Sequence, residues 1–276
     1  MDKKRTILIP WDFTEKAENA YAHAVRIAKF TEHSIALVNI IKENGEKTQI
    51  ENSFTEDRKR LLDKYGIEPK TLVREGDIFN TINNVAYEVN ADFVIMGTHG
   101  SKGMQKVTGS WALKVIIGSL VPYIVVQGPP KNDKITKILM PIDYKREEKE
   151  KIKWAYQFVK YFKAKVYVIH PLAKDYWLKK GIIGNLKFLR NFFNGVKVDY
   201  EIHTVERTKN YTEETMKLAD AIDADIILII TKKHLSWAGY IMGPQEQFFL
   251  NNSSRIPVMC INPKPGRLTG SFSSSG

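Results

Sequence analysis

GTHGSKGMQKVTGS, residues 97–110, is the glycine-rich stretch around which the rest of the sequence can be interpreted. The run Ala91–Met96 before it is apolar enough for a buried parallel strand, and the run Trp111–Ile116 after it has helical spacing. A loop between a strand and a helix lies at the ligand crevice of an open α/β sheet. Glycine residues let backbone N–H groups come close to an anion, and the N-terminus of the following helix adds a partial positive charge. The stretch therefore predicts a phosphate site, with a flexible connection as the alternative.

The chain around this loop alternates between predicted strands and predicted helices. Apolar runs predict strands at Arg5–Trp11, Ser34–Ile41, Lys70–Arg74, Ala91–Met96 and Val121–Gln127. Helical spacing predicts helices that begin near Thr14 and at 54–65, 78–90 and 109–118, with a polar loop at 42–53. This alternation predicts a parallel sheet with right-handed crossovers.

The pattern then occurs a second time, after a proline-containing linker at 128–133. Three segments match in order: Ile138–Tyr144 repeats Ile7–Phe13, Ala224–Thr231 repeats the strand that begins at Ala91, and Ile256–Met259 repeats Val121–Ile124. Ordered matches at both ends and in the middle indicate a duplicated domain. We expect one domain at residues 1–130, a second at 131–265 and a flexible tail at 266–276.

The two copies differ at the glycine loop. The positions of Gly97, Gly100, Gly103, Gly109 and Ser110 correspond to Thr231, His234, Trp237, Gly243 and Pro244. Proline has no N–H to donate. We therefore expect the second copy to keep the fold and to lack the phosphate-binding loop.

Composition restricts the class of protein. The 276 residues have an ordinary globular composition and no apolar run long enough to span a membrane, so we expect a cytoplasmic protein that does not bind membranes. The single Cys260 excludes an internal disulfide and any cysteine-cluster metal site. Of the 42 Lys and Arg residues, 17 lie in 1–130 with 16 of the 31 Asp and Glu residues. The net charge of +11 therefore belongs mainly to the second half, where lysines scattered along helices favour a solvated surface over a nucleic-acid site.

Residues 176–193 are the most hydrophobic and basic stretch of the second half. They predict a core helix with a solvated basic edge, and a lipid-binding or partner-binding helix is the alternative.

These features resemble the universal stress protein family in a tandem arrangement. The motifs that carry the resemblance are Pro-x-Asp-Phe-Thr at 10–14, the turn Glu75–Asp77, G-x2-G-x8-G-S at 97–110 and Pro122. The resemblance covers roughly residues 3–128 and 135–263. It implies an α/β fold of two tandem doubly wound parallel sheets, each similar to adenine-nucleotide α-hydrolases, with five strands in the order 3-2-1-4-5. ATP-binding members carry G-x2-G-x9-G-[ST], so this loop is one residue shorter.

The resemblance also implies a binding site for ATP in the first domain. Asp12 would contact adenosine and Ile40 would line the adenine slot, while the phosphates would be held by Gly97, Gly100, Gly109 and Ser110. A Mg²⁺ ion that bridges the phosphates is compatible with such a site. Asp12 could also simply cap the helix that begins near Thr14, a role that is compatible with a ligand contact, and His99 could be an exposed loop residue rather than a proton-transfer group.

Three functions stay open. The first is a tandem protein of the stress response that binds an adenine nucleotide in its first domain and has a structural or regulatory second domain. The second is a nucleotide-independent interaction module. A slow ATP hydrolase ranks last, because the sequence shows no nucleophile, paired carboxylates or metal-ligand cluster. Single-module relatives pair through their last strands, so we expect Val121–Gln127 to pair with Val258–Asn262 within the chain, and a homodimer of whole chains stays open.

Overall fold

The computed structural model describes residues 5–42, 47–98, 115–116, 119–206, 211–231, 234–236, 239–241 and 243–263. The expected tail at 266–276 lies outside these ranges. The first half contains β1 (Thr6–Pro10), α1 (Glu15–Thr31), β2 (Ser34–Ile41), α2 (Lys47–Tyr65), β3 (Lys70–Glu75), α3 (Ile78–Glu88), β4 (Ala91–Gly97) and β5 (Tyr123–Val126). The second half contains β6 (Lys137–Pro141), α5 (Glu148–Phe162), β7 (Lys165–Leu172), α6 (Tyr176–Gly195), β8 (Tyr200–Glu206), α7 (Tyr211–Ala221), β9 (Ile226–Ile230), β10 (His234–Ser236), β11 (Gly239–Ile241), α8 (Pro244–Leu250) and β12 (Val258–Ile261).

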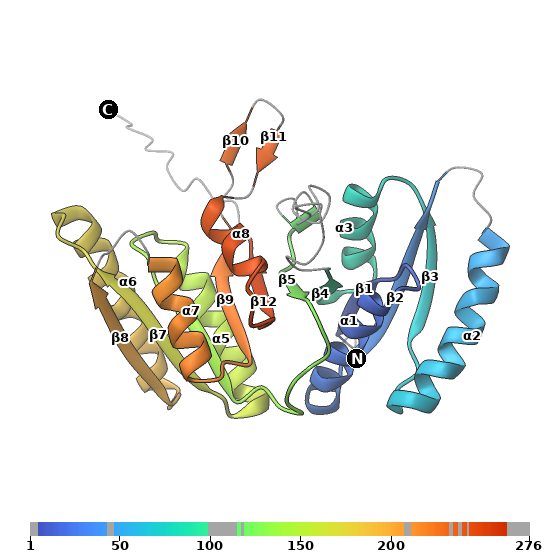
Figure 1. Ribbon diagram of the computed structural model, residues 1–276, viewed down its shortest axis with the longest axis horizontal. Helices are drawn as coiled ribbons and strands as arrows, with labels where there is room; N and C mark the ends of the chain where they lie inside the picture. The colour runs from blue at the N-terminus through green and yellow to red at the C-terminus, as the bar shows by residue number, and fades with distance from the viewer. Residues whose placement is uncertain are drawn as a thin grey trace, which may run out of the picture.

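Ten strands form one continuous sheet in the order β3-β2-β1-β4-β5-β12-β9-β6-β7-β8 (Figure 1). Within each half of this sheet the strands are parallel, and the first half has the expected order 3-2-1-4-5, whereas β10 and β11 form a separate antiparallel pair. The second half repeats this order as β8-β7-β6-β9-β12. The two five-stranded sheets meet at an antiparallel pair, in which Val258 lies opposite Val125 and Cys260 opposite Tyr123. The α/β class predicted from the sequence is confirmed, with the two sheets joined edge to edge.

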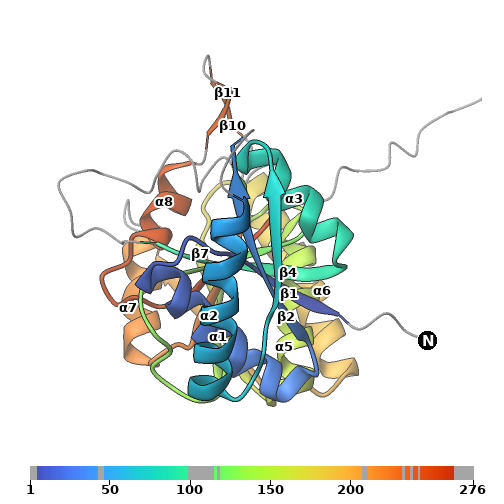
Figure 2. The ribbon, with the colours of Figure 1, turned by 90° about the vertical axis from the view of Figure 1, so that its right-hand side faces the viewer.

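Helices cover both faces of the sheet. One buried cluster joins the strands to α1, α2, α5 and α6, and a second joins the opposite face to α3, α7 and α8. Figure 2 shows the strands of the first half between α2 and α3. Strands that are covered on both faces are apolar at nearly every position, and this explains why β1, β4 and β9 were recognisable as continuous hydrophobic runs.

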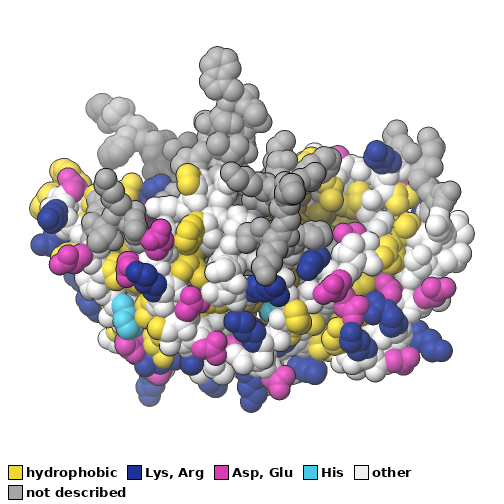
Figure 3. Space-filling view, viewed as in Figure 1, with side chains coloured by type: hydrophobic (Ala, Val, Ile, Leu, Met, Phe, Trp, Pro, Cys, Tyr) yellow, Lys and Arg dark blue, Asp and Glu magenta, His cyan; other side chains and the backbone are white. Residues whose placement is uncertain are grey.

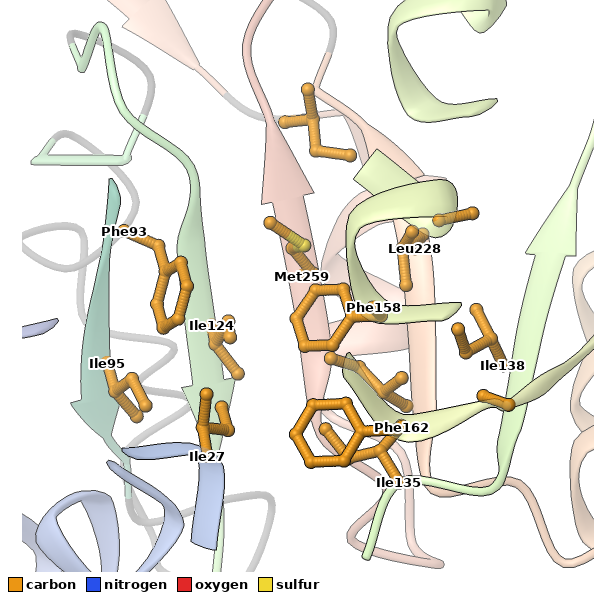
Figure 4. Packing of buried hydrophobic residues seen from close by; sticks show 14 of the residues in the cluster. Ile27, Phe93, Ile95, Ile124, Ile135, Ile138, Phe158, Phe162, Leu228 and Met259 are labelled. Atoms are coloured by element: carbon orange, nitrogen blue, oxygen red, sulfur yellow. The ribbon is translucent and has the colours of Figure 1, made fainter. Parts of the chain in front are cut away.

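The first of these clusters runs across the join between the halves. Phe158 and Phe162 of α5 lie beside Met259 of β12, with Phe93 and Ile124 on the other side (Figure 4). The rings of Phe93 and Phe158 stack with centroids 6.3 Å apart. The halves therefore share one hydrophobic core on this face.

The linker between the halves is fixed by buried hydrogen bonds. The Asp225 carboxylate accepts hydrogen bonds from Thr136 N and Oγ1, Lys137 N and Asn132 Nδ2, at 2.7–3.1 Å. Arg26 of α1 donates from Nη1 to the Asn132 carbonyl at 3.0 Å and lies 3.8 Å from the Asp225 carboxylate. This charge pair ties α1 of the first half to the residue that directly precedes β9 of the second.

One detail of the sequence-based prediction needs correction. Residues 47–53 are helical, because α2 begins at Lys47, although a loop was expected over 42–53. This helix buries only Phe54 and Leu61, so its first two turns show no apolar periodicity. The stretch 176–193 is part of α6, whose side chains Ile182, Leu186 and Phe193 lie in the core, in agreement with the core-helix interpretation.

Candidate functional site

A cavity of about 260 Å³ lies at the carboxyl ends of β1, β2 and β4. It brings together Asp12, Ile40 and Gly97, three of the residues that the sequence analysis placed at the ligand. Asp12 follows β1, Ile40 belongs to β2 and Gly97 ends β4. Because β2 and β4 flank β1 on opposite sides, the chain reverses its direction of winding here, and such a switch point is where open α/β sheets bind ligands.

Asp12 organises the start of α1 and keeps one oxygen unused. Its Oδ1 accepts hydrogen bonds from Thr14 N at 3.2 Å and Thr14 Oγ1 at 2.6 Å. Thr14 is the N-cap of α1, and its side chain accepts a hydrogen bond from Ala17 N. The alternative that Asp12 itself caps this helix is therefore wrong. Among the described residues Asp12 Oδ2 has no hydrogen-bond donor, so this exposed oxygen can accept one from a ligand.

Trp11 forms a rigid wall of the cavity. Its side chain is 2% exposed, and its Nε1 donates to Asp57 of α2 at 2.9 Å. Its carbonyl accepts from Asn39 Nδ2 at 2.7 Å, and its ring packs edge-on against Tyr21. Sequence reasoning missed Asn39 and Asp57, because nothing in a single sequence links positions so far apart. These bonds fix the loop that carries Asp12.

Gly97 has a packing reason to be glycine. A Cβ atom at this position would overlap the backbone carbonyl of Lys16. The backbone here remains part of the sheet, since Gly97 pairs in register with Val126 and Thr98 N donates to the Val126 carbonyl at 2.8 Å. The close approach brings the end of β4 against the segment before α1, and so closes one side of the cavity.

The turn Glu75–Asp77 determines where α3 begins. Gly76 has a φ of 142°, which favours glycine, and Asp77 is the N-cap of α3. The Asp77 carboxylate accepts hydrogen bonds from the backbone amides of Phe79 and Asn80. These bonds lower the pKa of Asp77, and the bond from the Asn80 backbone amide has the largest effect. As a result Ile78 and Ile82 of α3 line the cavity opposite β1. In Figure 3, hydrophobic side chains gather between α3 and the upper end of β2.

The other predicted phosphate ligands, Gly100, Gly109 and Ser110, lie outside the described residues, as does His99. Their roles stay predictions. Within the described ranges, no group of three or more His, Cys, Asp or Glu side chains is placed to hold a metal ion. On the face shown in Figure 3, Lys and Arg side chains are interspersed with Asp and Glu side chains.

The second half contains a larger crevice of about 730 Å³ at the corresponding position, beyond β6 and β9. Asp143 lies there as the counterpart of Asp12, and its Oδ1 accepts from Tyr144 N at 2.7 Å. α8 begins with Pro244 where the first copy has Ser110, so this position has no N–H to offer. No helix in the part of the chain that the structure describes has both the length and the apolar composition to cross a membrane.

Comparison with known proteins agrees with this geometry. Residues 4–127 match the model of the universal stress protein family. A universal stress protein of Synechocystis is 29% identical over 133 residues, which are 44% of this chain and 85% of that protein. One from Methanocaldococcus jannaschii is 27% identical over 143 residues, 46% of this chain and 84% of that protein.

A solved structure extends the likeness to both halves. The crystal structure of a universal stress protein from Archaeoglobus fulgidus is similar over 94% of this chain and 98% of its own, with a TM-score of 0.72. At 17% sequence identity this likeness shows the fold alone.

Proposed function

Because residues 4–127 are a domain of the universal stress protein family, we propose that the first half of this chain binds an adenine nucleotide, ATP, as part of a stress response. The proposal divides the chain into a nucleotide-binding domain at 1–130 and a structural or regulatory domain at 131–265. The observation that carries it is the convergence of Asp12, Ile40 and Gly97 on one cavity at the switch point of the sheet.

The cavity suits the nucleoside part of such a ligand. Its 260 Å³ lie just below the ~300–1,000 Å³ that small-molecule pockets usually enclose. Ile40, Ile78 and Ile82 offer apolar surface to a flat base, and the Asp12 carboxylate offers an acceptor to ribose hydroxyls. The phosphates would then extend outward toward the loop that follows Gly97, and the half-buried Lys16 lies at the same cavity as a counter-charge.

Magnesium would come with the phosphates. Mg²⁺ prefers phosphate oxygens and water, and keeps several waters when it binds to proteins. The described lining includes the single carboxylate of Asp12, so the ion would be bound mainly by the nucleotide. The role of this chain is to bind and orient the nucleoside.

In this proposal the second half pairs with the first half in the way that a second copy of the first half would pair in a dimer. β12 covers the edge of β5, which would otherwise expose unpaired backbone groups. Whole chains could associate further through the remaining edge strands, β3 and β8.

Thermal unfolding with added nucleotide tests the proposal. ATP with Mg²⁺ should raise the melting temperature more than GTP does, since a ligand that binds the native state stabilises it. Asp12→Asn should weaken ATP binding at least about tenfold, because a charge-assisted hydrogen bond contributes about 1.5–3 kcal/mol. The amide oxygen of Asn can still accept the hydrogen bonds of Thr14, so the turn before α1 is preserved.

Asp143→Asn is the matched control, because it makes the same change at the counterpart position in the second half. It should leave ATP binding unchanged. No thermal shift with millimolar ATP would reject the proposal and favour the nucleotide-independent interaction module. The eight residues between Gly100 and Gly109, one fewer than in ATP-binding members, are the observation that favours this second candidate.

A further inference from the structure

The crevice of the second half is large enough for a ligand of its own. Its volume of about 730 Å³ lies well within the ~300–1,000 Å³ range of small-molecule sites. Asp143 and Pro171 line it at the positions where Asp12 and Ile40 line the first cavity. A copy that had merely lost its ligand would be expected to fill this space with side chains, because protein interiors are close-packed.

One wall of this crevice is held in place by α6. Asn185 of α6 is buried and donates two hydrogen bonds from Nδ2, to the carbonyls of Asp143 at 2.8 Å and Lys145 at 2.7 Å. One turn earlier, Gly181 lets the helix approach so closely that a Cβ atom there would lie 2.5 Å from the Tyr144 carbonyl oxygen. The loop after β6 is therefore fixed by α6, and the crevice has a defined shape.

The first turns of α5 carry two buried charges at positions where α1 has alanine. Glu148 and Lys151 occupy the positions of Ala17 and Ala20, and both are buried. The Lys151 ammonium lies 2.6 Å from Glu148 Oε2 and also donates to the Pro141 carbonyl. The charge of Lys151 is thus balanced by Glu148 and its ammonium group is hydrogen-bonded, so it is not available to a phosphate group.

Glu246, in the first turn of α8, adds a carboxylate for which the described residues offer no hydrogen-bond or ion-pair partner. Its side chain is 4% exposed and lines the crevice, and among the described residues it makes no hydrogen bond or ion pair. Among the described residues that line the crevice, the charged groups are three carboxylates and two ammonium groups: Asp143, Glu148 and Glu246 against Lys145 and Lys151. An unpaired buried carboxylate is costly unless a cation or donor reaches it, and the same charge disfavours an anionic ligand.

We infer that this crevice binds a small organic molecule that carries a primary ammonium group on an apolar body, with the ammonium paired to Glu246. Leu178 and Ile182 of α6 and Phe249 of α8 line the crevice and supply apolar surface for the body of the ligand. The second half is then a sensor that binds an amine, and not a copy of the nucleotide domain without a ligand of its own. This inference concerns another site than the proposed ATP cavity and stands independently of it.

Calorimetric titration of the full chain with matched probes tests the inference. The amine probes are tyramine, tryptamine and hexylamine, and each is compared with a carboxylate of the same skeleton, such as 3-(4-hydroxyphenyl)propanoate for tyramine. At least one amine should bind in the millimolar range or tighter, and no carboxylate should. Glu246→Gln should weaken amine binding at least about tenfold, because it removes a charge-assisted contact without changing the shape of the side chain.

Glu147→Gln is the control, since Glu147 is exposed and its side chain caps nothing. It should bind the amine as the wild type does. Glu246→Gln should also raise the melting temperature of the free protein, because it removes a buried charge that no described residue pairs with, and this result separates lost binding from lost folding. Absence of amine binding, equal binding of amine and carboxylate, or binding that survives Glu246→Gln would each overturn the inference. ATP binding should be the same in both variants.

Discussion

At the scale of single residues, His23 shows how burial fixes a protonation state. His23 belongs to α1, and its buried ring faces the linker. Nε2 lies 3.1 Å from the Gly128 carbonyl oxygen, and because that oxygen can only accept, the proton must be on Nε2. Burial lowers the pKa of His23 to about 3, and the positive charge of Arg26 acts in the same direction. His23 is therefore neutral in the native protein at any pH near neutrality.

This neutrality predicts a loss of stability in acid. The unfolded chain binds a proton at His23 with a pKa near 6.5, whereas the native chain does so only near 3. The contribution of His23 is complete above pH 6.5 and falls by about 1.4 kcal/mol for each pH unit below it. In His23→Gln, whose amide can still donate to Gly128, this dependence should vanish. Urea unfolding of both proteins between pH 7.5 and 5 checks it, and parallel pH profiles would contradict it.

Gly97 predicts a second effect at this scale. Gly97→Ala would drive a methyl group into the Lys16 carbonyl and should cost about 1–3 kcal/mol of unfolding free energy without any ligand. Gly128→Ala is the control, because its nearest neighbour would be a side-chain atom of Arg255 at an ordinary 3.7 Å. It should change stability by less than about 0.5 kcal/mol. If both variants unfolded alike, the close approach of β4 to the start of α1 would not explain the glycine.

At the scale of elements, the sequence predicts strands better than helix ends. β2 was predicted with its observed bounds, because a strand buried on both faces is a continuous apolar run. The start of α2 was missed, because polar residues precede Phe54. At the site, the positions of Asp12, Ile40 and Gly97 follow from the parallel order of the strands. The bonds that hold Trp11 and the buried charges of α5 depend on contacts between distant segments, which a single sequence does not encode visibly.

α6 contains two glycines for which the structure predicts opposite effects. A Cβ atom at Gly184 would meet no other atom within 4 Å. Gly184→Ala should therefore stabilise the protein by about 0.5–1 kcal/mol, because alanine loses less backbone conformational entropy than glycine on folding. Gly181→Ala should destabilise it by about 1–3 kcal/mol, because the methyl group meets the Tyr144 carbonyl. Chemical denaturation measures both, and a stabilising Gly181→Ala would show that α6 does not hold the loop after β6.

At the scale of the whole molecule, the two halves are joined into one body. They share a sheet through β5 and β12, a core across Phe93 and Phe158, and the linker hydrogen bonds around Asp225. Such a molecule should unfold in one cooperative step rather than half by half.

Removal of Asp225 tests this coupling. Asp225→Ala deletes the acceptor of the linker hydrogen bonds and leaves the buried Arg26 without its counter-charge, so it should cost about 3–5 kcal/mol. Asp220→Ala, at an exposed position of α7, should cost less than about 0.5 kcal/mol. Differential scanning calorimetry of the two variants measures the loss. An Asp225→Ala protein as stable as the control would show that the linker is not held by this residue.

The central claim, that the first half alone holds an adenine nucleotide, is tested most directly by a crystal structure of the protein grown with ATP and Mg²⁺. We expect electron density for the base between Ile40 and Ile78, with the ribose at Asp12 and the phosphates beyond Gly97, and no nucleotide in the second half. Nucleotide density in the crevice beside Glu246, or none in either half at saturating ATP, would contradict it.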